Sequence, residues 1–239
     1  MMEALRKAGK VTSPKVYEAM RATDRGFYAP QDARKAAYAD SPQPIGHNAT
    51  ISAPHMHAIQ LEYLASNVPE SGARVLDVGS GSGYIAACFA RMVGETGRVV
   101  GIEHISALTS MSIQNVQRDD PSLLESGRLK LVTGDGRQGL PTDGPYHAIH
   151  VGAAAPELPP ALVEQLAPGG RMVCPVGPKG EIQRLVLVDR AANGKVSMHD
   201  AGGVVFVPLT DVGKQEAPGN STKIGAKVAF SMSRQRGLP

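Results

Sequence analysis

Short apolar runs alternate with amphipathic segments along most of this chain. Seven apolar runs predict strands, near residues 74–78, 98–103, 129–133, 146–151, 170–176, 182–189 and 203–208. Apolar residues at helical spacing, bounded by glycine or proline, predict helices near 83–93, 106–118 and 159–167. Strands that alternate with helices in this way form a mostly parallel sheet covered by helices. We therefore expect an α/β fold with a doubly wound, mostly parallel, seven-stranded sheet.

The residues before the first of these strands predict an N-terminal helical extension. Apolar residues within 16–20 and 56–63 have the spacing of amphipathic helices that pack on a sheet. Between them, residues 40–54 are rich in Pro, Gly, Ser and Asn, which indicates an ordered loop.

A glycine-rich turn follows the first strand of the sheet. Asp77 lies at the end of the apolar run, and Gly79, Gly81 and Gly83 follow at every second position before a predicted helix. A strand, a glycine turn and a helix allow a cofactor to lie against bare backbone. A dinucleotide-binding turn has the spacing Gly-x-Gly-x-x-Gly, and its third position here is Tyr84. The spacing therefore favours S-adenosylmethionine over a dinucleotide.

Acidic residues also follow the next two strands. Glu103 ends the second strand, and Asp135 lies in the turn after the third. The carboxyl ends of parallel strands meet at the edge where open α/β sheets bind ligands. A carboxylate at Glu103 can accept hydrogen bonds from two ribose hydroxyls, in nicotinamide and S-adenosylmethionine sites alike. Asp77, Glu103 and Asp135 together predict a ligand site at this edge more strongly than any one of them.

Composition and charge limit the setting in which the protein works. No run approaches the roughly 20 apolar residues of a membrane span, and the first ten residues lack the apolar core of a signal peptide. Four positive charges and no acid follow Glu216, and removing those four from the net charge of +3 leaves −1 for residues 1–216. The main part of the chain is therefore not basic, and nucleic-acid binding has little support.

The cysteines and histidines give no pattern of a metal site. Cys88 and Cys174 lie in a predicted helix and a predicted strand, which is typical of buried free thiols in a reducing cytosol. His55 and His57 would point about 200° apart on a helix, which is poor geometry for chelation. His150, on a predicted central strand, is expected to be a core histidine. We expect a cytoplasmic protein without a bound metal.

The length fits one domain with appendages. We expect residues 1–215 to form a single domain with N-terminal helices and a site loop (1–70), a cofactor-binding core (71–190) and a C-terminal strand region (191–215). Residues 216–239, rich in Gly, Pro, Ser and basic residues, are expected to form a flexible tail.

A family resemblance rests on the loop before the sheet together with the glycine turn. Residues 45–58 have the sequence Ile-Gly-His-Asn-Ala-Thr-Ile-Ser-Ala-Pro-His-Met-His-Ala. With the turn at 77–83, this segment resembles the protein-L-isoaspartate (D-aspartate) O-methyltransferases. Further similar segments lie at 134–137, 148–156 and 207–211. The resemblance covers roughly residues 4–215 and implies a Rossmann-like S-adenosylmethionine-dependent methyltransferase fold.

The resemblance implies a protein-repair activity. Enzymes of this family methylate the free carboxylate of L-isoaspartyl and D-aspartyl residues, which form when Asn deamidates or Asp isomerises through a succinimide. The ester returns through a succinimide toward normal aspartate. S-adenosyl-L-methionine would be the cofactor and S-adenosyl-L-homocysteine its product. The partners would be damaged proteins and peptides, with no nucleic acid and no membrane, and the enzyme would be a monomer.

The resemblance also implies the site residues. Ser52 matches the designated active-site serine of the family. The matching cofactor positions are Ala49, Thr50, Ile51, Ser52, His57, Ser82, Glu103, His104, Asp135, Gly136, Thr210 and Gln215. The glycine turn adds Asp77, Gly79 and Gly81 to these positions. Val212-Gly213 departs from the more charged stretch that the family suggests there, which weakens the match at Gln215.

The chemistry is consistent with these residue types. A substrate carboxylate with a pKa of about 4 is ionised at neutral pH and needs no general base. Because a sulfonium cation and a carboxylate combine into neutral products, a dry and enclosed site helps more than a strong counter-charge. The hydroxyl of Ser52 can orient the carboxylate by donating to one of its oxygens. Its alternative role is a helix N-cap or an ST-turn before Pro54.

Three other functions compete with this interpretation. Methylation of amino groups in bases or glutamine predicts an Asn/Asp-Pro-Pro-aromatic run after the fourth strand, where residues 151–156 are Val-Gly-Ala-Ala-Ala-Pro. A nicotinamide oxidoreductase is disfavoured by Tyr84 and by the lack of an evident hydride-transfer acid. A non-catalytic binding module is disfavoured by the presence of Ser52, Glu103 and Asp135.

Overall fold

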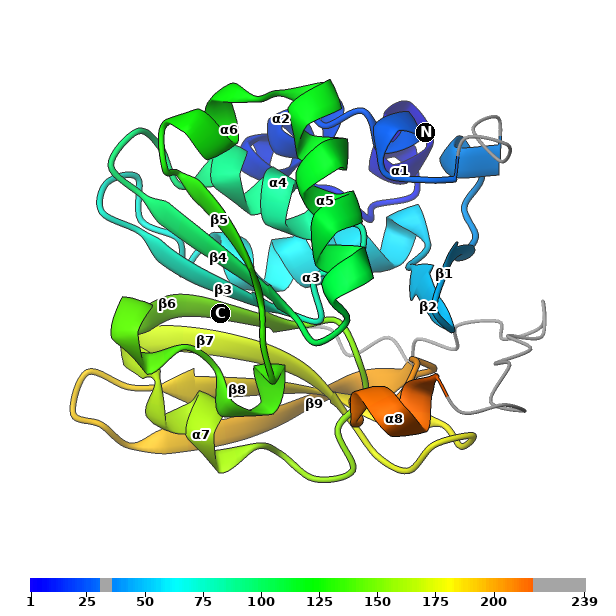
Figure 1. Cartoon of the computed structure of the whole chain (residues 1–239). Helices are drawn as coiled ribbons and strands as arrows, with labels where there is room; N and C mark the ends of the chain where they lie inside the picture. Colours follow the sequence, from blue (N-terminus) through cyan, green and yellow to red (C-terminus); the bar gives the residue numbers. More distant parts are fainter. Residues whose placement is uncertain (31–35, 217–239) are drawn as a thin grey trace.

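A seven-stranded sheet forms the centre of the protein, in a computed structural model that describes residues 1–30 and 36–216. Its order is β5-β4-β3-β6-β7-β8-β9 (Figure 1). The strands are β3 (Arg74–Val78), β4 (Arg98–Glu103), β5 (Leu129–Thr133), β6 (Tyr146–Val151), β7 (Leu166–Val176), β8 (Gln183–Arg190) and β9 (Val196–Val204). Strands β3 to β7 are parallel, and β8 is antiparallel to both of its neighbours. The expected α/β class and mostly parallel sheet are confirmed.

Helices cover both faces of the sheet. One face carries α3 (Pro54–Ala65), α4 (Tyr84–Met92) and α5 (Ser106–Asp119), with α1 (Met2–Lys7), α2 (Pro14–Ala22) and α6 (Ser122–Glu125) on the same side (Figure 1). The other face carries α7 (Pro160–Glu164). Because side chains alternate along a strand, Val75 packs toward α4 while Leu76 packs in the core that includes α7. None of the helices in the described part of the chain is long and apolar enough to cross a membrane.

The end of the fourth βα unit differs from the expectation. The sequence predicted a helix over 159–167 that ends at Pro168-Gly169-Gly170, but α7 ends at Glu164 and β7 begins at Leu166. The proline and glycines lie inside β7, where the pairing with β6 changes register between Tyr146 and Ala148. Proline and glycine are tolerated in a strand at such a bulge. The local sequence therefore marked a bulge and not a helix end.

The last strand was also misplaced. The prediction near 203–208 catches only the end of β9, which covers Val196–Val204. Strand β9 pairs with β8 alone, and its first five residues are exposed. An exposed edge strand needs no apolar run, so periodicity did not reveal it. Residues 207–209 instead reach Ala154, whose N–H donates to the Val207 carbonyl at 2.8 Å.

The segment 40–54 is ordered but is not only a loop. It contains a hairpin of β1 (Gln43–Gly46) and β2 (Ala49–Ile51). His47 and Asn48 connect the strands with φ values of 51° and 55°, the conformation of a tight hairpin turn. The hairpin therefore ends directly before Ser52 and fixes the path of the chain into α3.

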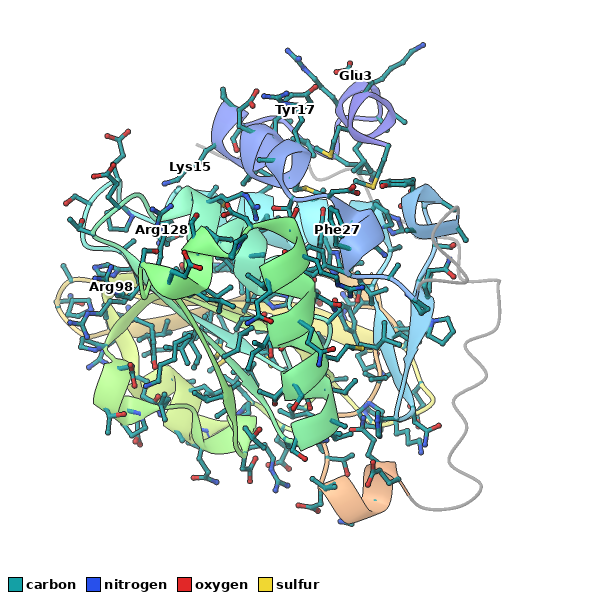
Figure 2. All side chains as sticks on the ribbon, turned by 45° about the horizontal axis from the view of Figure 1, so that its top comes forward. Glu3, Lys15, Tyr17, Phe27, Arg98 and Arg128 are labelled. Atoms are coloured by element: carbon teal, nitrogen blue, oxygen red, sulfur yellow. The ribbon has the colours of Figure 1, made fainter. Side chains whose placement is uncertain are left out.

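The N-terminal helices are tied to each other and to the segment that follows α3. Figure 2 shows Glu3 of α1 and Tyr17 of α2 close together, and the Tyr17 hydroxyl donates to Glu3 at 2.5 Å. On α2, Lys15 Nζ donates to the Val68 carbonyl at 2.5 Å. The expected helices over residues 16–20 and 56–63 are confirmed as parts of α2 and α3.

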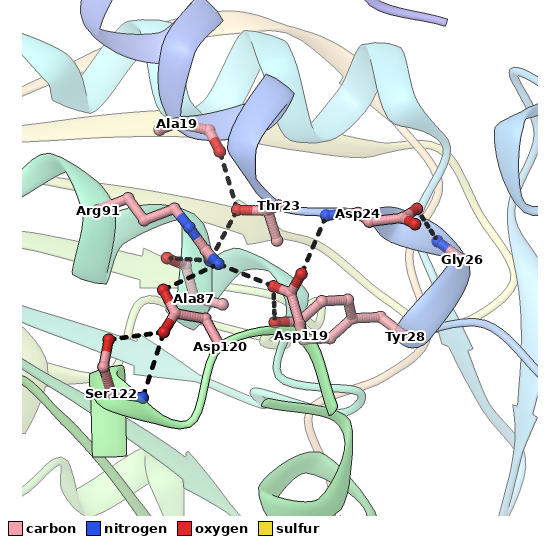
Figure 3. Close-up of polar contacts among 10 residues, drawn as sticks. All are labelled: Ala19, Thr23, Asp24, Gly26, Tyr28, Ala87, Arg91, Asp119, Asp120 and Ser122. Carbon is pink, nitrogen blue, oxygen red and sulfur yellow. Dashed lines mark hydrogen bonds and ion pairs between the residues drawn. The ribbon is translucent and has the colours of Figure 1, made fainter. Parts of the chain in front are cut away.

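A partly buried ion-pair network fastens the turn after α2 to the core (Figure 3). Arg91 of α4 pairs with Asp119 at 3.0 Å and donates to the Thr23 hydroxyl at 3.1 Å. Asp119 also accepts from the Tyr28 hydroxyl at 2.7 Å. We name Thr23, Tyr28, Arg91 and Asp119 the Arg91 clamp. It holds both ends of the short helix η1 (Arg25–Phe27), because Thr23 precedes that helix and Tyr28 follows it.

Candidate active site

The glycine turn lies where the carboxyl ends of β3 and β6 meet, at the point where the strand order reverses. Gly79, Gly81 and Gly83 all have positive φ values, of 71°, 49° and 84°. A Cβ added at Gly83 would lie 3.0 Å from Ser112 Cβ, so this turn and α5 approach each other too closely for a larger residue. The turn therefore presents main chain at the edge, as the sequence predicted.

Glu103 joins the ends of two neighbouring strands. Its carboxylate is buried and accepts from the Gly81 N–H at 3.1 Å and from the Ile105 N–H at 3.1 Å. A carboxylate has about four acceptor positions, so two remain open after these two bonds among the residues that the structure describes. An acceptor held beside bare glycine backbone is suited to two neighbouring hydroxyl groups.

Asp77 lies behind the turn in the core. Its carboxylate is 2.6 Å from Nδ1 of His150 on the adjacent strand, and both side chains are almost fully buried. Asp77 Oδ2 and His150 Nε2 have no hydrogen-bond partner in the part of the chain that the structure describes. His150 is thus the core histidine that the sequence predicted, with Asp77 as its partner.

Asp135 and Gly136 lie in the turn after β5, at the start of the short helix η3 (Gly136–Gln138). Asp135 pairs with Arg137 at 2.8 Å, and Arg137 also reaches Asp211 at 2.6 Å. The Arg137 guanidinium lowers the pKa of the Asp135 carboxyl. The ion pairs bring the segment that carries Thr210 to the same edge of the sheet.

The C-terminal helix α8 (Val212–Gln215) closes this edge from outside. Gln215 Oε1 is 2.8 Å from His104 Nε2, and Gln215 Nε2 donates to the His47 carbonyl at 2.9 Å. Asn48 Nδ2 in turn donates to the Gln215 carbonyl at 2.8 Å. Figure 1 shows α8 and the β1–β2 hairpin at the same end of the sheet. Gln215, the weakest match in the sequence, therefore lies with His104 at the predicted site.

Ser52 stands between the hairpin and α3, and its side chain does not cap the helix. The N-cap of α3 is Ala53, and the helix begins without a side-chain cap hydrogen bond. The alternative role of Ser52 as an N-cap is therefore wrong. Its side chain is half-buried, and β2 places Ala49, Thr50 and Ile51 directly before it.

A buried arginine that sequence analysis missed holds the Ser52 main chain. Arg25 Nη2 donates to the Ser52 carbonyl at 2.6 Å, and Arg25 Nη1 is 3.1 Å from His57 Nδ1. His57 also stacks on Tyr84, with 5.0 Å between the ring centres. A single sequence gives no indication of these contacts, because a buried arginine and an exposed one look alike in it.

His57 is buried beside a cation, and we expect this to make stability depend on pH. Burial and the Arg25 charge hold the pKa of His57 well below 6.5. Below about pH 6.5, His57 binds a proton in the unfolded chain but not in the folded chain. The free energy of unfolding therefore falls as the pH drops. The slope should approach about 1.4 kcal/mol per pH unit from this residue. Urea unfolding of the wild type and His57→Asn between pH 5 and 8 measures it. Equal slopes for the two proteins would contradict the prediction.

The other histidine of this segment, His55, lies at the surface side of α3. Its Nδ1 is 2.8 Å from Asp40 Oδ1, and its side chain is partly exposed. Within residues 1–30 and 36–216, no three His, Cys, Asp or Glu side chains are grouped as metal ligands would be.

The residues at this edge fit S-adenosylmethionine. Glu103 keeps open acceptor positions beside a glycine turn that offers bare backbone. The carbonyl of Ser82, in the same turn, accepts from Asn115 Nδ2 at 3.0 Å, which ties the turn to α5. His104 and Gln215 close the space from the side of α8. The fold and the site place this protein in the class of S-adenosylmethionine-dependent methyltransferases.

Comparison with known proteins identifies the family within this class. The family model described as protein-L-isoaspartate (D-aspartate) O-methyltransferase matches residues 1–214. The chain belongs to this family.

Relatives and solved structures agree with the assignment. The chain is 52% identical to protein-L-isoaspartate O-methyltransferase 1 of Arabidopsis thaliana, over 88% of this chain and 90% of the relative. It is 46% identical to the protein-L-isoaspartate O-methyltransferase of Caenorhabditis elegans, over 88% and 91%. Its fold resembles a Plasmodium falciparum protein described as a putative member, in complex with S-adenosyl-L-homocysteine. The TM-score is 0.79 at 35% identity, covering 87% of this chain and 96% of that one.

Proposed function

We propose that this chain transfers a methyl group from S-adenosyl-L-methionine to the free carboxylate of L-isoaspartyl and D-aspartyl residues in damaged proteins and peptides. The observation that carries the proposal is the placement of Ser52. Its side chain is free of helix capping, its main chain is held by Arg25, and it follows the hairpin whose turn meets α8 at the cofactor edge. A hydroxyl in this position can donate a hydrogen bond to the substrate carboxylate.

Ser52 would orient the substrate carboxylate and would not attack it. The carboxylate is already ionised, so the site needs no base. A hydrogen bond from the Ser52 hydroxyl to one oxygen turns the other oxygen toward the methyl donor. His57 is unsuited to act as a base here, because its Nδ1 faces the Arg25 guanidinium inside the core.

The residues that would hold S-adenosylmethionine come from five segments. Glu103 would accept from the ribose hydroxyls, and the turn with Gly79, Gly81 and Ser82 would lie along the cofactor. Asp135 with Gly136, Thr210 with Gln215, His104, and the hairpin residues Ala49 to Ile51 would complete the enclosure. The bound cofactor supplies a methyl group on a positively charged sulfur. The contacts between the hairpin and α8 would cover part of the cofactor edge, and exclusion of water there would favour a reaction that removes charge.

The setting of the activity is part of the same proposal. We propose that residues 1–215 work as one methyltransferase domain, as a monomer in the cytosol, with isoaspartyl proteins and peptides as partners and no nucleic acid. Free, buried Cys88 and Cys174 support a reducing compartment. The flexible tail that we propose over residues 216–239 lies outside the described residues, apart from Glu216, which directly follows α8.

The test is transfer of labelled methyl from S-adenosylmethionine to a short peptide with one isoaspartyl residue. The matched control is the same peptide with ordinary aspartate. Base-labile label on the isoaspartyl peptide alone supports the proposal. If neither peptide is methylated while the cofactor still binds, the assignment to the methyltransferase class stands and the proposed isoaspartyl substrate is rejected.

A further inference from the structure

Arg25 is a buried cation whose partners among the described residues are all neutral. It is fully buried, and its guanidinium contacts the Ala37 carbonyl at 2.7 Å, the Ser52 carbonyl at 2.6 Å and His57 Nδ1 at 3.1 Å. It also lies over the ring of Tyr84, 5.4 Å from its centre. No carboxylate within the described ranges forms an ion pair with it.

Asp40 influences Arg25 but forms no ion pair with it. Asp40 acts on Arg25 by long-range electrostatic attraction. Its carboxylate accepts from the main-chain N–H of His55 and contacts the His55 ring. Burial lowers the pKa of Arg25 to about 10, which leaves the guanidinium charged at neutral pH. A buried charge that no carboxylate of the described residues neutralises is costly for a fold, which points to a role beyond packing.

The position of Arg25 is fixed independently of the site. The Arg91 clamp holds Thr23 before it and Tyr28 after it (Figure 3). The guanidinium therefore reaches the Ser52 carbonyl from a segment that is hydrogen-bonded to the core on both sides of Arg25.

We propose that Arg25 is a positioning residue that sets the orientation of Ser52 and makes the neighbouring substrate position favour a negatively charged group. This inference rests on the proposed function, because it assigns the substrate carboxylate to the Ser52 end of the site. The fixed carbonyl holds the main chain from which the Ser52 hydroxyl projects. The Arg25 charge, held on the Ser52 carbonyl, favours a carboxylate over a neutral isostere at the adjacent substrate position.

Two variants test separately the positioning of Ser52 and the effect of the charge. Arg25→Lys keeps the charge but loses the planar fork that reaches several acceptors at once. Arg25→Met keeps much of the volume and loses the charge. The proposal predicts that Arg25→Lys mainly lowers kcat, by about tenfold, because Ser52 is no longer held. It predicts that Arg25→Met also loses the preference of the site for a carboxylate over a neutral group.

The charge part is measured by binding, without turnover. The probes are a fluorescent isoaspartyl peptide and the matched isoasparaginyl peptide, whose side group is a neutral amide. Anisotropy in the presence of S-adenosylhomocysteine gives the ratio of their Kd values. The wild type and Arg25→Lys should bind the isoaspartyl peptide more tightly than the isoasparaginyl peptide. This preference should shrink at least about fivefold in Arg25→Met. A purely structural role for Arg25 would not change this ratio.

Controls separate this inference from the proposed function. Arg21→Met removes an exposed arginine of the neighbouring helix, paired with Glu18, and should change neither kcat nor the ratio. An unchanged ratio in a folded Arg25→Met would overturn the charge part, and unchanged kcat in Arg25→Lys would overturn the positioning part. If Arg25→Met does not fold, Arg25→Gln replaces it. Failure of the wild type to methylate the isoaspartyl peptide would instead reject the proposed function.

Discussion

Replacing Ser52 by alanine is expected to lower methyl transfer to an isoaspartyl peptide by about 100-fold, with almost no change in cofactor affinity. The helix that follows has no side-chain cap, so the substitution removes no capping bond and should leave stability close to that of the wild type. The loss comes from a substrate carboxylate that is bound but no longer turned toward the methyl donor. Steady-state kinetics gives the first quantity, and calorimetric titration with S-adenosylmethionine gives the second.

The matched control for this variant is Ser66→Ala, at the other end of the same helix. Ser66 is exposed and its hydroxyl donates to the neighbouring Asn67 side chain at 3.2 Å, so activity should not change. If Ser52→Ala lost cofactor affinity as strongly as turnover, Ser52 would be a cofactor residue and its orienting role would be rejected.

Replacing Glu103 by alanine is expected to weaken binding of S-adenosylmethionine by about 1–3 kcal/mol, or about 5- to 150-fold in Kd. The carboxylate accepts two backbone N–H groups and still has acceptor positions for two hydroxyls. Its removal therefore takes away charged acceptors and also leaves the Gly81 N–H without its partner. Isothermal titration of the variant and the wild type at one salt concentration measures the difference.

A second substitution separates the two effects of Glu103. Glu103→Gln keeps the volume but places an amide N–H near one of the backbone donors, so it should fall between the wild type and Glu103→Ala. Glu181→Ala, on an exposed loop, is the control for an equal change of charge. Unchanged affinity in Glu103→Ala would remove this residue from the ribose position.

The site was predictable where its residues follow a local pattern. Asp77, Glu103 and Asp135 each follow a strand, and parallel strands place their carboxyl ends at one edge whatever else packs around them. The structure still divided their roles. Asp77 turned inward to His150, Glu103 bridged two backbone N–H groups, and Asp135 joined an exposed ion pair with Arg137.

The elements that periodicity missed are those stabilised by pairing and not by an apolar face. Strand β9 is an exposed edge, and the β1–β2 hairpin is short and turns at His47 and Asn48. The helix end expected at Pro168 became a bulge, because tertiary pairing between β6 and β7 overrode the local sequence.

By itself, the sequence determined the α/β class, the glycine turn, the acids at the strand ends and the resemblance carried by the Ser52 segment. These depend on neighbours within a few residues, where side-chain spacing dictates local structure. Only the tertiary structure decided that Gln215 meets His47, 168 residues away, and that Arg25 lies buried against Ser52 and His57. Such contacts depend on which surfaces the whole chain removes from water, and no local pattern contains that information.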